Sequence, residues 1–271
     1  MQSNLCRGGR QAMNLCRPDD QKSCAACCGL YNIPKATRPT LWKNLETRTI
    51  LFRQTERSLE AVEKFEALIR ASGAVSRVDN AIHVCEFTGF LDEALKVVGC
   101  MLHPSSPGNR GIDLRGLCHY GSMACKAFFC PAWDELDQRR LGILFDTIED
   151  WHLYGLIITD VDFVRSLFGL IEERLGKEIK QGPLSAGPAL RIFKQMLSWK
   201  DSWPFGRLSS MRKSRYYFNG SCVPGGNAYE AHLARLLDTI RFTFDIADGM
   251  DGAEPFVRQM MEDFVSAYNY R

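Results

Sequence analysis

Residues 125–151 read CKAFFCPAWDELDQRRLGILFDTIEDW, a stretch in which a pair of cysteines gives way to an amphipathic pattern. Cys125 and Cys130 stand directly before Pro131. Proline is favoured in the first turn of a helix, because the N–H that it lacks has no helical partner there. Apolar residues then recur at helical spacing: Trp133, Leu136, Leu141, Leu144, Ile148 and Trp151. We therefore expect a helix from Pro131 to Trp151 with a cysteine-bearing segment in front of it.

The sequence on either side of this stretch is also mostly helical in pattern. Apolar stripes predict helices over 161–175, 190–199, 229–240 and 256–268, the first of them stopped by Gly176. Upstream, a stripe from Thr40 to Ser72-Gly73 predicts one long helix, 81–84 a strand, and 91–98 a short helix. Tyr216-Tyr217-Phe218 before Asn219-Gly220 is typical of a hairpin.

Loop-like sequence is concentrated near the N-terminus. Residues 1–39 and 103–118 carry glycine and proline without apolar periodicity. We therefore predict a mainly α fold with a small irregular or β cysteine-rich part. Its two regions are 1–131, which binds metal, and 132–271, which is helical and packs with the first as one unit.

Composition excludes several classes of protein. The 271 residues are 45% hydrophobic and 24% charged, as in ordinary globular proteins, so the chain can bury a core without help from a metal. A net charge of +2 argues against nucleic-acid binding and against a polybasic membrane anchor. No apolar run is long enough to span a membrane, and the first residues lack a signal-peptide pattern. We expect a cytoplasmic protein.

Cysteine usage is the main functional signal. Ten of the 11 cysteines lie in the first 130 residues, and Cys222 is the other. Disulfides are rare in a reducing compartment, so another explanation is needed. The segment Cys24-Ala-Ala-Cys27-Cys28-Gly29 contains a C-x-x-C step, which lets two thiolates turn toward one ion, and Gly29 gives the backbone freedom that a tight metal loop needs.

A second group of cysteines lies some seventy residues further on. Cys100 precedes Met-Leu-His-Pro, and a thiolate at Cys125 or Cys130 would gain from the positive end of the following helix. Further candidate ligands are Cys85, Cys118, Cys16 and His103. The alternative for any single cysteine is that of a small buried hydrophobe, which suits Cys85 and Cys222.

These motifs resemble those of a family of cysteine-cluster proteins described as chelators of zinc or iron. The resemblance covers residues 20–131 and rests on the C-x-x-C-C block, the cysteine at 100 and the closing C-x(4)-C pair. It implies six metal ligands: Cys24, Cys27, Cys28, Cys100, Cys125 and Cys130. The family commonly has another cysteine three or four residues before the block, where this chain has Asp20 and Gln21. Cys16 is a candidate substitute.

The sequence leaves the metal and its role open. All-sulfur ligation suits an iron–sulfur cluster or zinc, and the number of candidate thiolates leans toward iron. The centre is expected to be structural or to store, deliver or sense metal. One alternative is a cluster-dependent protein-modifying enzyme, by analogy with lysine-methylating flagellin-modifying proteins, with a substrate pocket among the C-terminal helices; another is a zinc-braced interaction module. No nucleotide-binding, metalloprotease or serine-hydrolase motif occurs, and no catalytic residue is assigned.

Overall fold

A computed structural model of the chain describes residues 14–128, 130–206, 228–244, 246 and 250–270. This part is mainly α-helical, as predicted, with a two-stranded antiparallel sheet. No helix in it is long and apolar enough to cross a membrane. In chain order the elements are the 3-10 turn η1 (Ala26–Cys28), α1 (Arg38–Gln54), α2 (Leu59–Ala71), β1 (Thr88–Phe90), β2 (Val98–Cys100), η2 (Arg115–Leu117), α3 (Gly121–Ala127), α4 (Ala132–Glu135), α5 (Gln138–Thr147), α6 (Trp151–Ile158), α7 (Val161–Leu175), η3 (Gly182–Leu184), α8 (Gly187–Ser198), α9 (Ala228–Phe244) and α10 (Ala253–Asn269).

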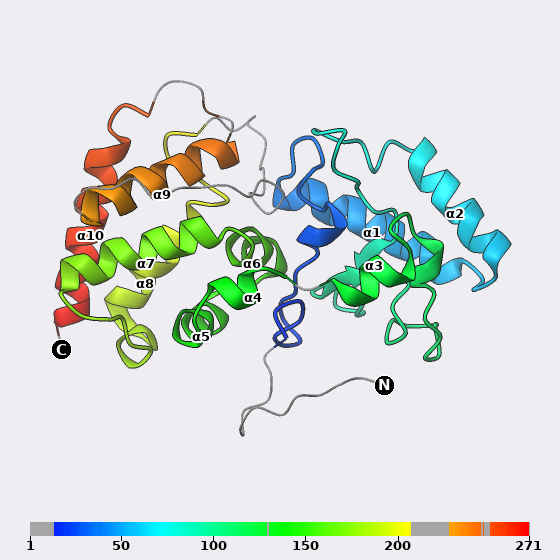
Figure 1. Cartoon of the computed structure of the whole chain (residues 1–271), viewed down its shortest axis with the longest axis horizontal. Helices are drawn as coiled ribbons and strands as arrows, with labels where there is room; N and C mark the ends of the chain where they lie inside the picture. The colour runs from blue at the N-terminus through cyan, green and yellow to red at the C-terminus, as the bar shows by residue number, and fades with distance from the viewer. Residues whose placement is uncertain (1–13, 129, 207–227, 245, 247–249, 271) are drawn as a thin grey trace.

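The helices gather into two lobes with the N-terminal loop between them. Figure 1 shows α1, α2 and α3 on one side and α4 to α10 on the other. Each lobe has its own core of buried apolar residues. Three residues cross over: Leu15 joins the helical core, while Trp151 and Leu156 of α6 join the N-terminal core. The change of core thus falls near residue 131, and α6 ties the lobes together.

The helical lobe follows the predicted elements closely. α7 packs chiefly on α9, and α8 on α10. The Asp160 carboxylate accepts a hydrogen bond from the Phe163 amide at 3.0 Å, which caps α7, and Gly176 ends α7 in the left-handed conformation. The helices predicted over 161–175, 190–199, 229–240 and 256–268 are all confirmed. The predicted hairpin at Tyr216–Gly220 and Cys222 lie outside the described residues.

The single helix predicted from Pro131 to Trp151 is wrong, because the chain forms α4, α5 and α6 there. Asp137 accepts a hydrogen bond from the Arg140 amide at 2.9 Å and so starts α5. Asp150 accepts from the His152 and Leu153 amides, at 2.9 and 3.1 Å, and starts α6. Each aspartate adopts an extended backbone to cap the next helix, which interrupts the helix before it.

The long helix predicted from Thr40 to Ser72 is also interrupted. α1 ends at Gln54, and Ser58 caps α2 by accepting a hydrogen bond from the Ala61 amide. Thr37, rather than Thr40, occupies the N-cap position of α1. The apolar stripe continues through the break because both helices face the same core, so periodicity alone does not reveal it.

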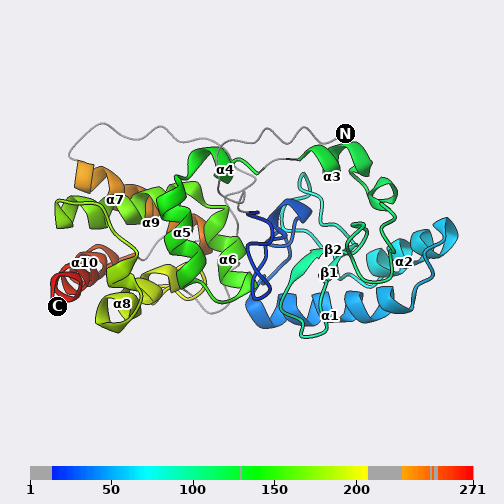
Figure 2. The same ribbon diagram turned by 90° about the horizontal axis from the view of Figure 1, so that it is seen from below.

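Two short predictions between α2 and α3 are corrected. Residues 81–84 are loop rather than strand, because the Asn32 side chain donates to the Asp79 and Ile82 carbonyls and holds a turn. Residues 91–98 form a turn rather than a helix, since the Asp92 carboxylate accepts from the amides that follow it. This turn lets Val98 return to pair with Phe90, and the β1–β2 hairpin packs on α1. In Figure 2 the N-terminal loop lies between this hairpin and α6.

Candidate metal centre

The C-x-x-C-C segment folds as a tight turn against the loop before β1. η1 ends at Gly29, whose φ is +78°. The Cys85 amide donates to the Cys28 carbonyl at 2.9 Å, which joins two segments that lie far apart in the sequence. A Cβ atom on Gly29 would lie 2.1 Å from the His83 carbonyl oxygen, so only glycine allows this approach. The glycine expected to serve the cysteine loop therefore sets the distance between two cysteines.

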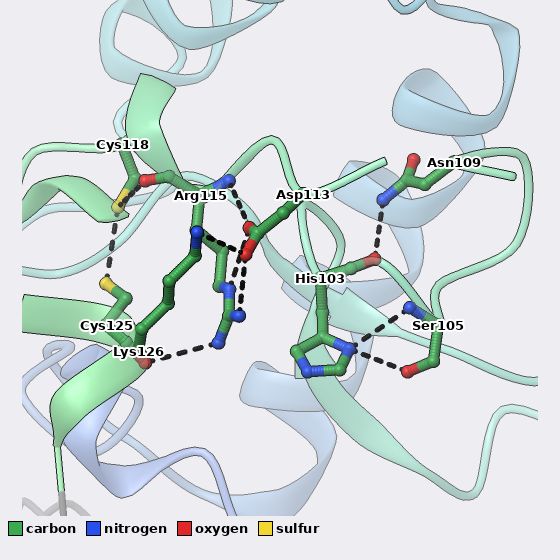
Figure 3. Close-up of polar contacts among 8 residues, drawn as sticks. All are labelled: His103, Ser105, Asn109, Asp113, Arg115, Cys118, Cys125 and Lys126. Atoms are coloured by element: carbon green, nitrogen blue, oxygen red, sulfur yellow. Dashed lines mark hydrogen bonds and ion pairs between the residues drawn. The ribbon is translucent and has the colours of Figure 1, made fainter. Parts of the chain in front are cut away.

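Five cysteine thiols converge within the N-terminal lobe, and we call them the inner group: Cys28, Cys85, Cys100, Cys118 and Cys125. The thiol of Cys28 interacts electrostatically with those of the other four. The closest pair is Cys118 and Cys125, whose sulfurs are 3.4 Å apart (Figure 3). All nine cysteines of the described residues are free thiols, so this contact is not a disulfide.

The surroundings of Cys85, Cys100 and Cys125 favour the protonated thiol. Burial, followed by the Cys28 thiol, raises the pKa of Cys100 to about 12. Burial and Cys118 raise the pKa of Cys125 to about 12. The pKa of Cys85 is also well above its usual range, for the same reasons. A bound cation would reverse this preference, because it favours the thiolate and displaces the proton.

Four cysteines share a backbone arrangement that suits a metal-bound thiolate. In each of them the sulfur accepts a hydrogen bond from the amide two residues further on. The donor–acceptor pairs are Ala26 to Cys24, Phe87 to Cys85, Leu102 to Cys100 and Ala132 to Cys130. The first of these measures 3.5 Å from nitrogen to sulfur. Amides that donate to sulfur stabilise its anionic form and fix its direction.

Two arginines lie beside the inner group. Arg48 of α1 is fully buried, donates to the Cys85 carbonyl at 2.9 Å, and has an Nη2 without a hydrogen-bond partner among the described residues. Burial lowers the pKa of Arg48 to about 10, and the Cys85 and Cys28 thiols oppose that shift. The Glu86 carboxylate also lies within electrostatic reach of this buried cation, and thiolates at Cys85 and Cys28 would add to the negative charge around it.

The second arginine, Arg115, belongs to a polar loop on the other side (Figure 3). It forms a bidentate ion pair with Asp113, at 2.9 and 2.8 Å, and donates to the Cys125 carbonyl at 3.3 Å. Lys126 is also 3.0 Å from Asp113. The Arg115 and Lys126 hydrogen bonds lower the pKa of Asp113. Arg115 also lies within electrostatic reach of the Cys100 and Cys125 thiols.

The remaining cysteines are divided differently from the sequence expectation. Cys24 and Cys130 lie with Cys16, and we call these three the outer group. Cys27 interacts with the neighbouring Cys28. The ring of His103 accepts from the Ser105 amide at 3.2 Å and also contacts its hydroxyl, which turns it toward its own loop (Figure 3). Cys85 and Cys118, which were only further candidates from sequence, lie in the inner group.

One buried trio combines three potential ligand types. Ligand atoms of His83, Cys85 and Glu86 lie within 4.8 Å of one another. Arg77 is 2.8 Å from His83 Nδ1. Because a guanidinium can only donate, the ring proton sits on Nε2, which faces Glu86 at 3.3 Å. The arrangement is a buried polar chain from Arg77 to Glu86 and does not suit a cation. The spacing of His83 and Glu86 in the sequence gives no sign that these residues form a buried polar network.

The spacing of the cysteine sulfurs bears on the kind of centre. Among the described residues that trio is the one group of three ligand atoms within 4.8 Å, so no three sulfurs come that close. A tetrahedral zinc ion with Zn–S bonds of about 2.3 Å holds its sulfurs ~3.8 Å apart. Two of the inner sulfurs, those of Cys118 and Cys125, already lie 3.4 Å apart, and the others would have to move toward them to bind one zinc ion.

The described surface pockets lie away from the cysteines. One is lined by residues around η3, the start of α8 and the end of α10, and a second by α5, α7 and α9 residues such as Arg140, Glu172 and His232. No cysteine lines either of them. The substrate pocket expected beside the cluster therefore has no counterpart in these two.

Comparison with known proteins gives no relative from which to transfer a function. No family model matches the chain, and no curated protein or solved structure is detectably similar to it. The resemblance to the cysteine-cluster family stays a prediction from residues 20–131. What the chain does has to follow from the chemistry of its own site.

Proposed function

We propose that the inner group binds a thiolate-ligated metal centre and that metal binding is the function of the N-terminal lobe. The observation that carries this proposal is the convergence of five free thiols from four separate segments of the chain. Clustered thiolates are ligands of zinc and of iron–sulfur centres. A buried structural cysteine, by contrast, has no need of four others around it.

The neighbouring charges and hydrogen bonds support a metal centre bound by several thiolates. Four thiolates around one divalent ion carry a formal charge of about −2. The fully buried Arg48 and the half-buried Arg115 lie where they would offset that charge. The amides of Phe87 and Leu102 donate to Cys85 and Cys100, which stabilises the same thiolates.

Of the two metal classes, the geometry favours an iron–sulfur cluster. Its inorganic core is larger than a single ion, so its cysteine ligands stand further apart, and among the described residues no three sulfurs lie within 4.8 Å of one another. Five thiols also provide the four that such a cluster takes. Zinc is the second candidate, and it requires the sulfurs to draw together around the ion.

The centre would act first as a brace. It would join the turn after η1, the loop before β1, the end of β2 and the segment from η2 into α3, none of which belongs to a long helix. Both lobes have apolar cores of their own, so the helices do not depend on it. Iron would add the capacity for electron transfer.

The test is metal analysis of the full chain purified without oxygen. We expect a brown protein with iron and acid-labile sulfide, whereas a colourless protein with zinc would select the other metal. Cys85→Ser and Cys118→Ser should each lose most of the metal. The control is Cys222→Ser, a cysteine remote in sequence that lies outside the described residues, which should keep it. Equal metal in all three variants and the parent would refute the inner group as the ligands.

A further inference from the structure

Two cysteines of the inner group lie in direct sulfur contact. The Cys118 and Cys125 sulfurs are 3.4 Å apart, and both residues are free thiols (Figure 3). The Cys118 thiol donates to the Arg115 carbonyl at 3.2 Å, so its sulfur is left to accept a hydrogen bond from the Cys125 thiol. A disulfide bond measures about 2.05 Å, so the sulfurs need to approach each other by on the order of 1 Å to form one. That is a movement of side chains rather than a change of fold.

Contacts at both ends of the η2–α3 segment hold the two thiols together. Cys118 directly follows η2, and Cys125 lies in α3. The Gly121 amide donates to the Cys118 carbonyl at 2.9 Å, and the left-handed φ of Gly121, +71°, lets the chain turn sharply there. Toward the end of α3, the Arg115 guanidinium donates to the Cys125 carbonyl at 3.3 Å. The sulfur contact is therefore fixed by hydrogen bonds of its own segment.

The helix that carries Cys125 is open to solvent along much of its length. Met123 is 84% exposed, and Lys126 beside Cys125 is also exposed. Cys125 itself is half-buried, whereas Cys118 is only 8% exposed. A small reagent in solution therefore reaches the Cys125 thiol first, and the buried Cys118 thiol is already in contact with it. An accessible thiol with a second thiol next to it is the arrangement of cysteines that react reversibly with oxidants.

We infer that Cys118 and Cys125 form a reversible disulfide when a low-molecular-weight disulfide oxidises them, and that this bond releases the metal of the inner group. The disulfide rests on the sulfur contact alone, whereas its consequence for the metal rests on the proposed function. The bond removes two of the inner thiols and leaves those of Cys28, Cys85 and Cys100. Three thiols are one fewer than the four that an iron–sulfur cluster or a structural zinc ion takes.

The reaction is a thiol–disulfide exchange in two steps. The Cys125 sulfur attacks one sulfur of the small disulfide, which forms a mixed disulfide and expels one small thiolate. The Cys118 sulfur then attacks Cys125 in the mixed disulfide, forms the protein disulfide and expels the second small thiolate. The two protein sulfurs are oxidised and the two sulfurs of the small disulfide are reduced. The expelled thiolates take up the two thiol protons or, where a metal had displaced these, protons from water. A Zn²⁺ ion leaves with its oxidation state unchanged.

The first measurement treats the reduced, metal-free full chain with glutathione disulfide and identifies the product by mass spectrometry. Trypsin cleaves after Arg115 and Lys126, so one peptide, 116–126, carries both cysteines. We expect this peptide to resist alkylation and to weigh two hydrogen atoms less than its reduced form, and a reducing thiol to reverse the change. In Cys118→Ser the peptide should instead gain one glutathione. Peroxide is a poorer probe, because it would also oxidise the exposed Met123 in the same peptide.

The second measurement loads the reduced chain with Zn²⁺ and follows its release to a chromogenic chelator after glutathione disulfide is added. We expect release in step with oxidation of the 116–126 peptide, and full zinc content again after reduction and reloading. Cys27→Ser is the matched control, because Cys27 belongs to the C-x-x-C step but not to the inner group, and it should release zinc as the parent does. Cys100→Ser should form the same disulfide even where it holds less zinc.

The outcomes separate this inference from the proposed function. If the peptide stays reduced, or if Cys118 and Cys125 pair with other cysteines instead, the disulfide is refuted whatever the metal content. If the disulfide forms and the zinc stays bound, the coupling between them is refuted. If the disulfide forms but Cys85→Ser holds as much zinc as the parent, the proposed function fails and the disulfide stands.

Discussion

Replacing Gly29 by alanine tests whether the distance between the η1 turn and the loop before β1 controls the inner group. The new Cβ would lie 2.1 Å from the His83 carbonyl oxygen, whereas ordinary contact begins near 3.4 Å, so the two segments must separate by 3.4 − 2.1 = 1.3 Å. The Cys85 amide is 2.9 Å from the Cys28 carbonyl and would lose its hydrogen bond on that movement. The left-handed φ of Gly29 adds strain of its own for alanine.

These effects give a rough magnitude. Strain of about 1–2 kcal/mol for a non-glycine residue at positive φ, together with about 1 kcal/mol for the lost hydrogen bond, makes a loss of stability of about 2–3 kcal/mol. For a chain of this size that corresponds to a fall in Tm of roughly 4–12 °C. Metal ligands tolerate about 0.2 Å, so a shift of 1.3 Å also removes Cys28 or Cys85 from any shared centre.

Two glycines of the same chain provide controls for the melt and the metal content. Gly111 also has a positive φ, +81°, but a Cβ there meets nothing within 4 Å, so Gly111→Ala carries the strain without the clash. Gly142 lies within α5 in open space, so Gly142→Ala should be neutral or stabilising by up to about 1 kcal/mol. We expect metal loss in Gly29→Ala alone. The reasoning is refuted if Gly29→Ala keeps the metal and melts no lower than Gly111→Ala.

Three further predictions concern buried charges. The side chain of Glu86 is fully buried, and although burial alone would raise its pKa, hydrogen bonds from His83 and Arg70 lower it to about 2. Its stabilisation is therefore present above pH ~4.5 and is lost as the pH falls toward the folded-state pKa, so Glu86→Gln should cost on the order of 2 kcal/mol at pH 7 and much less at pH 3 in urea denaturation. Arg48→Met should leave the metal-free protein equally or more stable, because it removes a buried charge whose Nη2 has no hydrogen-bond partner among the described residues. It should weaken metal binding about 10-fold in a chelator competition, because the metal-bound thiolates lose a positive charge beside them; unchanged affinity would contradict this. Lys200→Met breaks a buried ion pair with Asp160 at 2.7 Å and should destabilise by about 3–5 kcal/mol while metal content per folded chain stays at the parent value.

The helical lobe could be read from sequence because local signals agree with its packing. Over 161–175 the apolar stripe, the capping aspartate at 160 and the stop at Gly176 all indicate the same helix, and the structure has it. The helix predictions were wrong where a polar residue ends one helix and caps the next, while the apolar stripe continues on the same face. Ser58 and Asp137 each cap a new helix, and a side chain that competes for backbone amides is easily taken for an exposed helical position.

The content of the cysteine region was predictable, but its grouping was not. Clustering of thiols along the chain is visible in sequence, and C-x-x-C spacing suggests that Cys24 and Cys27 face one ion. In the structure Cys24 lies with Cys130, whereas Cys28 lies with Cys85 and Cys125. Cys85 reaches Cys28 through a backbone hydrogen bond across 57 residues, and no local pattern encodes such a contact.

The separation into two groups follows from the position of the cysteine loop between two apolar cores. Such a loop has one face toward each lobe, and a short turn such as η1 sends successive side chains to opposite faces. Cys24 thus contacts both cores and Cys28 only the N-terminal one. A metal held on each face would fasten the loop to both lobes at once, and α6, which contributes Trp151 to one core and Tyr154 to the other, already joins those lobes through apolar contacts. The number of ions bound, more than their identity, therefore decides whether the cysteine loop holds one metal centre or two centres that each link it to one lobe.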